Sequence, residues 1–323
     1  MARARIRREW LQKNLTTITP ITAAIVLMIA LRALNPFFLA TYESVVTLIY
    51  GMSWFLIAAC GLTFVILMGS FDFSIPSVLK LSAMLCGVFY PQVGFAVIPL
   101  AIMVSLLFGF INGVLLAKFS IPSFMTTLAT SFVAEGLAQI ISGGYTRILS
   151  DPSFTAISIT FIPAKFGLPS IFYWAIALWA VGIIVTLITP FGRAVYGIGG
   201  NLTGARLAGI NITKVRILVF MLSAFFASIA GILYAAQIQG AHMQIGVLDT
   251  IPLFASVVVG GTALSGGTGG IHRTLLGVII IRWLDSGMSM IGVDYNVRMI
   301  VFGAIAIIMT IATIDRRRIK IMK

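Results

Sequence analysis

The chain has 323 residues, of which 59 % are hydrophobic and only 10 % are charged, and its mean hydropathy is +1.08. Because charged residues make up about 25 % of an average soluble domain, this composition excludes a soluble globular protein and predicts a polytopic membrane protein. The net charge of +13 does not indicate a nucleic-acid-binding protein, since the basic residues gather at the two ends and in one central segment.

Apolar runs of about 17–25 residues predict membrane-spanning helices, whereas barrel strands would give alternating segments of about ten residues. Ten spans are predicted, near 18–38, 45–68, 77–92, 95–117, 124–142, 171–189, 217–238, 252–268, 274–291 and 296–314. We therefore expect an all-α transmembrane helical bundle that forms one domain over residues 1–323. The basic tails, 1–17 and 315–323, place both termini in the cytoplasm by the positive-inside rule. No cleavable signal peptide is expected at the basic start.

Two of the spans run into sequence that disfavours a regular helix. Residues 69–76 read GSFDFSIP and residues 260–270 read GGTALSGGTGG. Non-helical backbone at membrane depth is tolerated only where protein buries it or where it lines a water-filled cavity, so we expect broken or re-entrant segments at the working centre. The glycine-rich run lacks the lysine of a phosphate-binding loop. The candidate pathway or gate residues are Asp72, Ser74, Asn112, Thr262 and Ser265.

The few ionisable residues within the spans are the next candidates, because a charge in the hydrocarbon layer is costly unless it is paired or hydrated. Asp72 can cap the helix that follows it or contact a solute, and the sequence leaves both roles open. Lys80 lies too far along for a pair with Asp72 and is expected to extend to the interface. Arg282 and Asp285, three residues apart, predict an ion pair.

A polar segment, 190–216, interrupts the apolar chain between the sixth and seventh spans. It holds Arg193, Arg206, Lys214 and Arg216 and no acidic residue, which places it in the cytoplasm. Residues 202–207 can form one or two helical turns between a helix-starting Asn201 and a helix-ending Gly209. Composition alone fits either a docking element or a basic loop that only fixes topology.

Motifs of enzymatic chemistry do not occur in the sequence. His242 and His272 lack the HExxH spacing, there is no nucleophile elbow, and Cys60 and Cys86 lack a CxxC spacing. We expect no catalytic site, no metal and no cofactor in this chain. There is also no nucleotide-binding domain, so a partner would have to supply any ATP hydrolysis.

Four motifs together resemble the permease subunits of ribose-type ATP-binding cassette (ABC) importers, the carbohydrate and furanosyl-sugar branch of that family. The most specific match lies at Phe191, Gly192, Arg193, Tyr196, Gly199, Gly200, Asn201, Ala205, Arg206, Gly209 and Ile210. A second lies at Val259, Gly260, Gly261, Thr262, Leu264, Gly266, Gly267 and Gly269. The other two lie at Phe71, Asp72, Phe73, Ser74, Ile75, Pro76 and Ser77 after Gly69, and at Phe108, Gly109, Ile111, Asn112 and Gly113 before Ile121, Pro122 and Phe124. The resemblance covers nearly the whole chain and is weakest at the N-terminus and in 143–170.

The resemblance implies a multi-pass permease of the inner membrane that imports a monosaccharide. It implies three partners: a cytoplasmic ATPase that binds Mg-ATP, an extracytoplasmic sugar-binding protein, and a second permease subunit, identical or homologous. The expected coupling residues, which would dock on the ATPase, are Gly200, Asn201, Leu202, Thr203, Ala205, Arg206, Leu207 and Gly209.

Four positions depart from the family pattern, namely Pro76, Lys80, Glu135 and Arg273. They leave the solute open among ribose, another pentose, a hexose and a furanosyl signalling sugar, and they leave the permease pair open between two identical and two different subunits. The alternative function is an ion-coupled secondary transporter of a small polar solute, with Asp72, Glu135 or Asp285 as the ion site. An intramembrane enzyme built on Asp72 and Asp285 is the third alternative, although no spacing supports it.

Overall fold

The computed structural model describes residues 21–164 and 167–313. The two predicted cytoplasmic tails, 1–17 and 315–323, lie outside these residues. The longer helices are the first one, Ile21–Leu34, and α2 Tyr42–Leu67, α3 Ile75–Val93, α4 Val97–Lys118, α5 Ser123–Ser142, α7 Ser170–Leu187, α10 Ile212–Gln237, α11 Thr250–Val259, α12 Ile271–Met290 and α13 Tyr295–Thr313. Each predicted span overlaps one of them, so the all-α class is confirmed.

Five helical segments of the described chain are long and apolar enough to cross a membrane, namely Tyr42–Leu67, Ile75–Lys118, Ser123–Ser142, Ser170–Leu187 and Ile212–Gln237. The second of these contains α3 and α4, joined by the short 3-10 turn η1 Gly94–Ala96. Gly94 has a φ of 58°, and α3 and α4 pack against each other. The polytopic class is therefore confirmed, while ten crossings and two cytoplasmic ends stay predictions.

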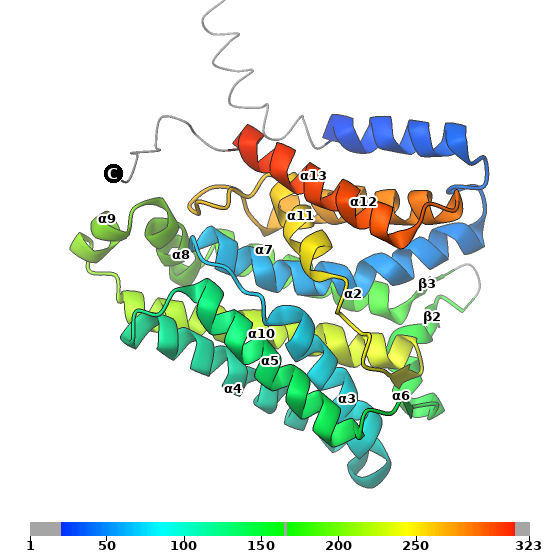
Figure 1. Ribbon diagram of the computed structural model, residues 1–323, viewed down its shortest axis with the longest axis horizontal. Coiled ribbons are helices and arrows are strands. Elements are labelled where there is room, and N and C mark those ends of the chain that lie inside the picture. The colour runs from blue at the N-terminus through cyan, green and yellow to red at the C-terminus, as the bar shows by residue number, and fades with distance from the viewer. Residues whose placement is uncertain (1–20, 165–166, 314–323) are drawn as a thin grey trace, which may run out of the picture.

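The helices pack around α10, which contacts α2, α3 and α4. Figure 1 shows α2 and α10 in the middle of the bundle, with α3, α4 and α5 on one side and α12 and α13 on the other. Two glycines let α4 approach α10 closely: a Cβ on Gly109 would lie 2.5 Å from the carbonyl oxygen of Phe220, and a Cβ on Gly113 would lie 2.5 Å from the Cα of Ile217. This spacing of four residues is the small-residue pattern that favours helix association in membranes.

The eighth predicted span, 252–268, is wrong in its second half. Helix α11 ends at Val259, and its ten residues rise about 15 Å, which is half of the roughly 30 Å hydrocarbon core. Residues 260–270 form a non-helical loop in which five glycines have φ values between 74° and 151°, which side-chain-bearing residues rarely adopt. The expected break is therefore present, and it shortens the helix itself.

Short elements that the spans did not predict lie in the polar segments. In 143–170 these are α6 Pro152–Ile159 and the strands β1 Arg147–Ile148, β2 Phe161–Ile162 and β3 Leu168–Pro169. β1 pairs antiparallel with β4 Gly240–Ala241, and β2 pairs antiparallel with β3. In 190–216 there are two helices, α8 Pro190–Gly200 and α9 Leu202–Leu207.

The same sequence signal marks α6 and α8. Each begins with a capping residue followed by proline, Asp151 before α6 and Thr189 before α8. The capping oxygens accept hydrogen bonds from the first free backbone N–H groups, and proline at the first helical position has no N–H to satisfy. The sequence analysis expected helical turns in 190–216 only over 202–207, and α8 corrects this expectation. The Thr189-Pro190 pair that marks the start of α8 is visible in the sequence.

Candidate functional site

The two broken segments meet at one end of α2. The first break, residues 68–74, separates α2 from α3, and the glycine loop, residues 260–270, separates α11 from α12. The N–H of Gly267 donates to the carbonyl oxygen of Leu67 over 2.9 Å. A Cβ on Gly266 would lie 2.6 Å from the backbone nitrogen of Gly69. Because both approaches are between backbones, a shift of either segment would move the backbone of the other.

Asp72 is buried within the first break, with 2 % of its surface exposed. Its Oδ1 accepts hydrogen bonds from the N–H of Ser74 at 2.9 Å and from the Ser74 hydroxyl at 2.5 Å, and its Oδ2 accepts one from the Ser223 hydroxyl at 2.7 Å. The hydrogen bond from the Ser74 N–H closes an Asx turn before α3 and is not a helix cap, because Ser74 is itself the N-cap residue and α3 has no side-chain cap hydrogen bond. Burial and three hydrogen bonds within the chain favour a structural role for Asp72 over contact with a solute.

The polar network continues from Asp72 to the candidates on α4 and α5. The amide of Asn112 donates to the Ser74 hydroxyl over 3.1 Å, and the hydroxyl of Thr130 donates to the Asn112 carbonyl oxygen over 2.7 Å. Ser74 and Asn112 are both buried. Three predicted pathway residues, Asp72, Ser74 and Asn112, are thus brought together, and they form the support behind the first break.

The other two predicted pathway residues lie apart, in the glycine loop. The Thr262 hydroxyl is buried and accepts a hydrogen bond from the N–H of Gly270 at 3.2 Å, which holds the loop's two ends together. Ser265 is exposed near the loop's tip. Thr262 and Ser265 thus belong to the glycine loop, whereas Asp72 and Ser74 belong to the first break and Asn112 to α4.

Four phenylalanines from different segments form a cluster beside the first break. Phe73 stacks on Phe254 of α11 with ring centroids 4.8 Å apart, and it meets Phe124 of α5 edge to face at 5.2 Å. Phe71 lies 6.1 Å from Phe254. These rings connect the first break, between α2 and α3, to α11, which ends at the glycine loop. The sequence interpretation missed this cluster, because its members are far apart along the chain.

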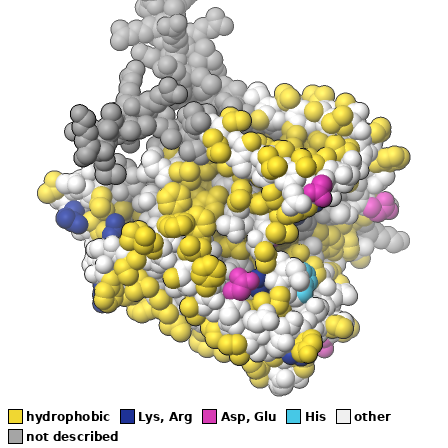
Figure 2. All heavy atoms as spheres, in the orientation of Figure 1, with side chains coloured by type: hydrophobic (Ala, Val, Ile, Leu, Met, Phe, Trp, Pro, Cys, Tyr) yellow, Lys and Arg dark blue, Asp and Glu magenta, His cyan; other side chains and the backbone are white. Residues whose placement is uncertain are grey.

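Next to the cluster is a groove between α3, α5 and residues 246–250, which we call the charged groove. It encloses about 170 Å³ and is lined by Phe73, Pro76, Ser77, Lys80, Leu128, Ser131, Glu135, Gly246, Val247 and Thr250. The Nζ of Lys80 donates to Oε1 of Glu135 at 2.6 Å. Figure 2 shows a small group of basic, acidic and histidine side chains within a mostly hydrophobic face.

The prediction that Lys80 extends to the membrane interface is wrong. Only 2 % of its side chain is exposed, against 44 % for Glu135. The reason is that α3 packs on α5, so the ammonium group finds a carboxylate on the neighbouring helix before it reaches water. Lys80 and Glu135 were noted separately as departures from the family pattern, and in the structure they are partners.

The junction of the two breaks also contacts α8. A Cβ on Gly199 would lie 1.9 Å from the carbonyl oxygen of Leu67 and 2.6 Å from the backbone nitrogen of Gly267, so only glycine fits there. The Tyr196 hydroxyl donates to the carbonyl oxygen of Gly269 over 2.8 Å. Burial raises the pKa of Tyr196, against a smaller opposite effect of Arg273, so this phenol stays a neutral donor at physiological pH.

Directly after α8, the helix α9 covers Leu202–Leu207 as predicted, and the Asn201 side chain caps it by accepting from the N–H of Gly204 at 2.9 Å. Gly209 has a φ of 77° and ends the turn. Ala205 is buried, whereas Leu207 is 85 % exposed. The other predicted coupling residues that are exposed are Gly200, Asn201, Leu202, Thr203, Arg206 and Gly209.

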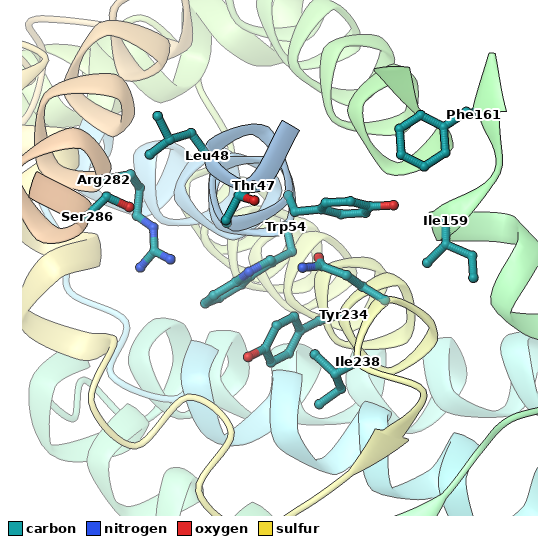
Figure 3. Close-up of a pocket in the computed structure, with 12 residues that line it drawn as sticks. Thr47, Leu48, Trp54, Ile159, Phe161, Tyr234, Ile238, Arg282 and Ser286 are labelled. Carbon is teal, nitrogen blue, oxygen red and sulfur yellow. The ribbon is translucent and has the colours of Figure 1, made fainter. Parts of the chain in front are cut away.

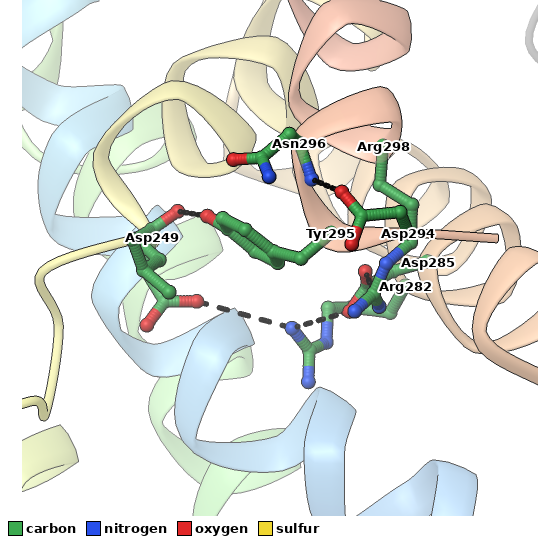
Figure 4. Close-up of polar contacts among 8 residues, drawn as sticks. Asp249, Arg282, Asp285, Asp294, Tyr295, Asn296 and Arg298 are labelled. Carbon is green, nitrogen blue, oxygen red and sulfur yellow. Dashed lines mark hydrogen bonds and ion pairs between the residues drawn. The ribbon is translucent and has the colours of Figure 1, made fainter. Parts of the chain in front are cut away.

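The expected pair of Arg282 with Asp285 is present at 3.4 Å and belongs to a larger group (Figure 4). Arg282 also lies 3.9 Å from Asp249, and Arg298 of α13 lies 2.8 Å from Asp285. Two cations and two carboxylates thus join α12, α13 and the start of α11, which is a charge-neutral arrangement suited to a membrane interior.

A family model described as branched-chain amino acid transport system / permease component matches residues 44–310. The chain belongs to this family. It is 31 % identical to the ribose import permease protein of Bacillus subtilis, over 93 % of this chain and 92 % of that protein. It is 30 % identical to the ribose import permease protein of Haemophilus influenzae, over 90 % of each chain.

The L-arabinose transport system permease protein of Escherichia coli is 31 % identical, over 87 % of this chain and 85 % of that protein. No solved structure gives a significant match. The predicted membership of the ribose-type ABC importer permeases is confirmed, and the chain is a multi-pass protein of the inner membrane.

Proposed function

We propose that this chain is the membrane permease of an ABC importer that takes up a monosaccharide, driven by ATP hydrolysis in a separate ATPase. An extracytoplasmic binding protein would deliver the sugar, and a second permease subunit, identical or homologous, would complete the pathway. The observation that carries the proposal is the exposed helix α9, which is joined through α8 to both broken membrane segments. Relatives whose names state ribose and arabinose transport support the sugar as solute.

Helix α9 is the surface on which the ATPase would dock. It presents Leu202, Arg206 and Leu207 to solvent, one charged and two apolar side chains on a short, capped helix. Closure of the ATPase subunits would move α9 and α8 as one piece. The backbone of Gly199 touches both Leu67 and Gly267, so the movement would reach α2 and the glycine loop directly.

The phenylalanine cluster is the gate that we propose at the junction. Phe73 follows the end of α2 and Phe254 belongs to α11, so a shift of the first break against the glycine loop would separate the stacked rings. The charged groove next to them would receive the sugar when the gate opens. Its exposed Glu135 carboxylate and its Ser131 and Thr250 hydroxyls offer weak polar contacts, which suits a transport route because conduction requires that the solute also leaves.

The experiment that tests the proposal is sugar uptake by proteoliposomes that contain this chain, its ATPase and its binding protein, with and without internal ATP. A panel of D-ribose, L-arabinose, D-galactose and D-fructose would identify the solute. We expect uptake that requires both ATP and the binding protein. Uptake by this chain alone, driven by a proton or sodium gradient, would favour the secondary-transporter alternative.

The docking role of α9 has a separate test. Arg206→Glu reverses an exposed charge and should lower the amount of ATPase that co-purifies, with membrane insertion unchanged. Lys118→Glu, an exposed residue at the end of α4, is the matched control. Equal co-purification of Arg206→Glu and wild type would remove Arg206 from the coupling residues.

A further inference from the structure

A second cavity lies within the bundle, away from the charged groove. It encloses about 680 Å³ between α2, α6, α10 and α12 (Figure 3) and shares no lining residue with the groove. Trp54 in its wall lies about 20 Å along α2 from Leu67, at 1.5 Å per residue, so the cavity is at the other end of α2 from α8 and α9. Its rim includes Ile159 and Phe161 of the segment predicted outside the membrane. We call it the outer cavity.

Aromatic rings form much of the wall of the outer cavity. Trp54 and Tyr234 lie with ring centroids 4.6 Å apart, and Tyr50 meets Phe161 edge to face at 6.4 Å. The face of an aromatic ring carries partial negative charge and attracts the weakly positive C–H groups of a ring laid on it. Such walls with a few polar groups between them are typical of small-molecule sites.

One polar atom of the cavity has no partner of its own. The Oε1 of Gln237 is buried without a hydrogen bond, although Gln237 lines the cavity. Leaving a buried acceptor unsatisfied costs about 1–3 kcal/mol. A rotation of the Gln237 side chain toward the cavity would let a ligand hydroxyl donate to Oε1 and remove that cost. Thr47 and Ser286, on α2 and α12, add two hydroxyl groups to the lining.

The charges of the described residues around the cavity disfavour an anionic ligand. Arg282 is the cation in its wall, but its guanidinium already lies between Asp249 and Asp285 and over the rings of Trp54 and Phe55, at 5.7 and 5.1 Å. With Arg298 on Asp285, the group has two positive and two negative charges (Figure 4). Among the lining residues that the structure describes, a phosphate or carboxylate ligand would find no unpaired cation, whereas a neutral polyol would find acceptors, donors and aromatic faces.

We propose that the outer cavity is a binding site for a neutral monosaccharide within a single permease subunit. It would hold the solute before the sugar reaches the charged groove, and the proposal rests on the proposed function. The volume, the aromatic walls and the unsatisfied Gln237 point to one sugar ring with donor hydroxyls. Lipid acyl chains would leave the Gln237 oxygen unsatisfied.

Thiol protection tests the site in the full chain. The two native cysteines, Cys60 and Cys86, are buried, so a single new thiol dominates labelling by a charged methanethiosulfonate reagent. Ser286→Cys places that thiol in the α12 wall of the cavity, and Thr47→Cys places one in the α2 wall. Tyr145→Cys, at an outer position that is 72 % exposed, is the control. The protein is held in nanodiscs, where both membrane faces are accessible, and D-ribose, L-arabinose, D-galactose and D-fructose are the probes.

We expect at least one sugar to slow labelling of both cavity thiols several-fold and to leave Tyr145→Cys unchanged. Gln237→Leu in the Ser286→Cys background should raise the half-protecting concentration about tenfold. No protection by any of the four sugars, or equal protection of the control thiol, overturns the proposal, as does a Ser286→Cys thiol that no reagent reaches. ATP-dependent sugar uptake by the complete importer distinguishes the two failures: uptake without protection refutes this site alone, and no uptake of any sugar refutes the proposed function.

Discussion

The pair of Lys80 and Glu135 should respond unequally to removal of its two partners. Lys80→Met leaves the Glu135 carboxylate, which is 44 % exposed and can be hydrated in the groove. Glu135→Gln leaves an ammonium group whose side chain is only 2 % exposed and whose carboxylate is gone. Removing one partner of a fully buried pair costs about 3–5 kcal/mol, and because Glu135 is partly exposed we expect about 2 kcal/mol for Glu135→Gln. For Lys80→Met we expect less than about 1 kcal/mol, as for a half-exposed pair.

The double variant Lys80→Met/Glu135→Gln should be about as stable as Lys80→Met, because no charge is left without a partner. Thermal unfolding of the purified chain in nanodiscs measures the series. At about 2–4 °C per kcal/mol, Glu135→Gln should lower the Tm by roughly 4–8 °C. Lys118→Met, on an exposed lysine, is the control. Equal losses in the two single variants, or a double variant as unstable as Glu135→Gln, would refute the assignment of the buried charge to Lys80.

Three further variants test other parts of the site. Asp72→Asn keeps an acceptor for the Ser74 hydrogen bonds and an amide that can donate to Ser223, so ATP-dependent sugar uptake should survive. Asp72→Ala leaves buried donors unsatisfied and should abolish uptake. Loss of uptake in both variants would indicate a need for the charge. Gly113→Leu should cost about 1–3 kcal/mol or more in thermal unfolding because α10 lies against it, and Gly136→Leu, with open space around it, should cost little. Tyr196→Phe removes the hydrogen bond to the glycine loop. In proteoliposomes it should lower the amount of sugar transported per ATP hydrolysed, while the binding of the ATPase stays unchanged. An unchanged ratio of sugar to ATP would exclude Tyr196 from coupling.

Local signals account for the parts of the fold that the sequence predicted. Apolar runs located most of the long helices within a few residues, the exception being the span 252–268, which runs past the end of α11 at Val259. The pattern of Asn201 and Gly209 located α9 because caps act on adjacent backbone groups. Glycine and proline content located both breaks. The residue pairs Asp151-Pro152 and Thr189-Pro190 are the same kind of local signal and mark the starts of α6 and α8.

Contacts between distant segments account for what the sequence did not predict. Lys80 and Glu135 are on different helices, and Phe73 and Phe254 are separated by most of the chain, so no periodicity relates them. The sequence predicted Arg282 only as the partner of Asp285, and no motif or spacing singles out Gln237 or Trp54. Only the packing of α2, α10 and α12 places all three around one cavity.

The pairing of Lys80 with Glu135 changes the meaning of two departures from the family pattern. Taken singly, a lysine and a glutamate in a transport route would each suggest a charged solute or an ion site. Together they sum to zero charge in the groove, so they fit a neutral solute as well as an apolar pair would. The pair also fixes the position of the Glu135 carboxylate, of which the side chain is 44 % exposed. This carboxylate can therefore accept hydrogen bonds from hydroxyl groups in only one part of the groove. A site that hydrogen-bonds a hydroxyl discriminates strongly against a solute that lacks it. If the charged groove selects the sugar in this way, Glu135→Gln in the Lys80→Met background should change the relative uptake of the four sugars while the transporter remains folded, and an unchanged order of preference would restrict the pair to stability.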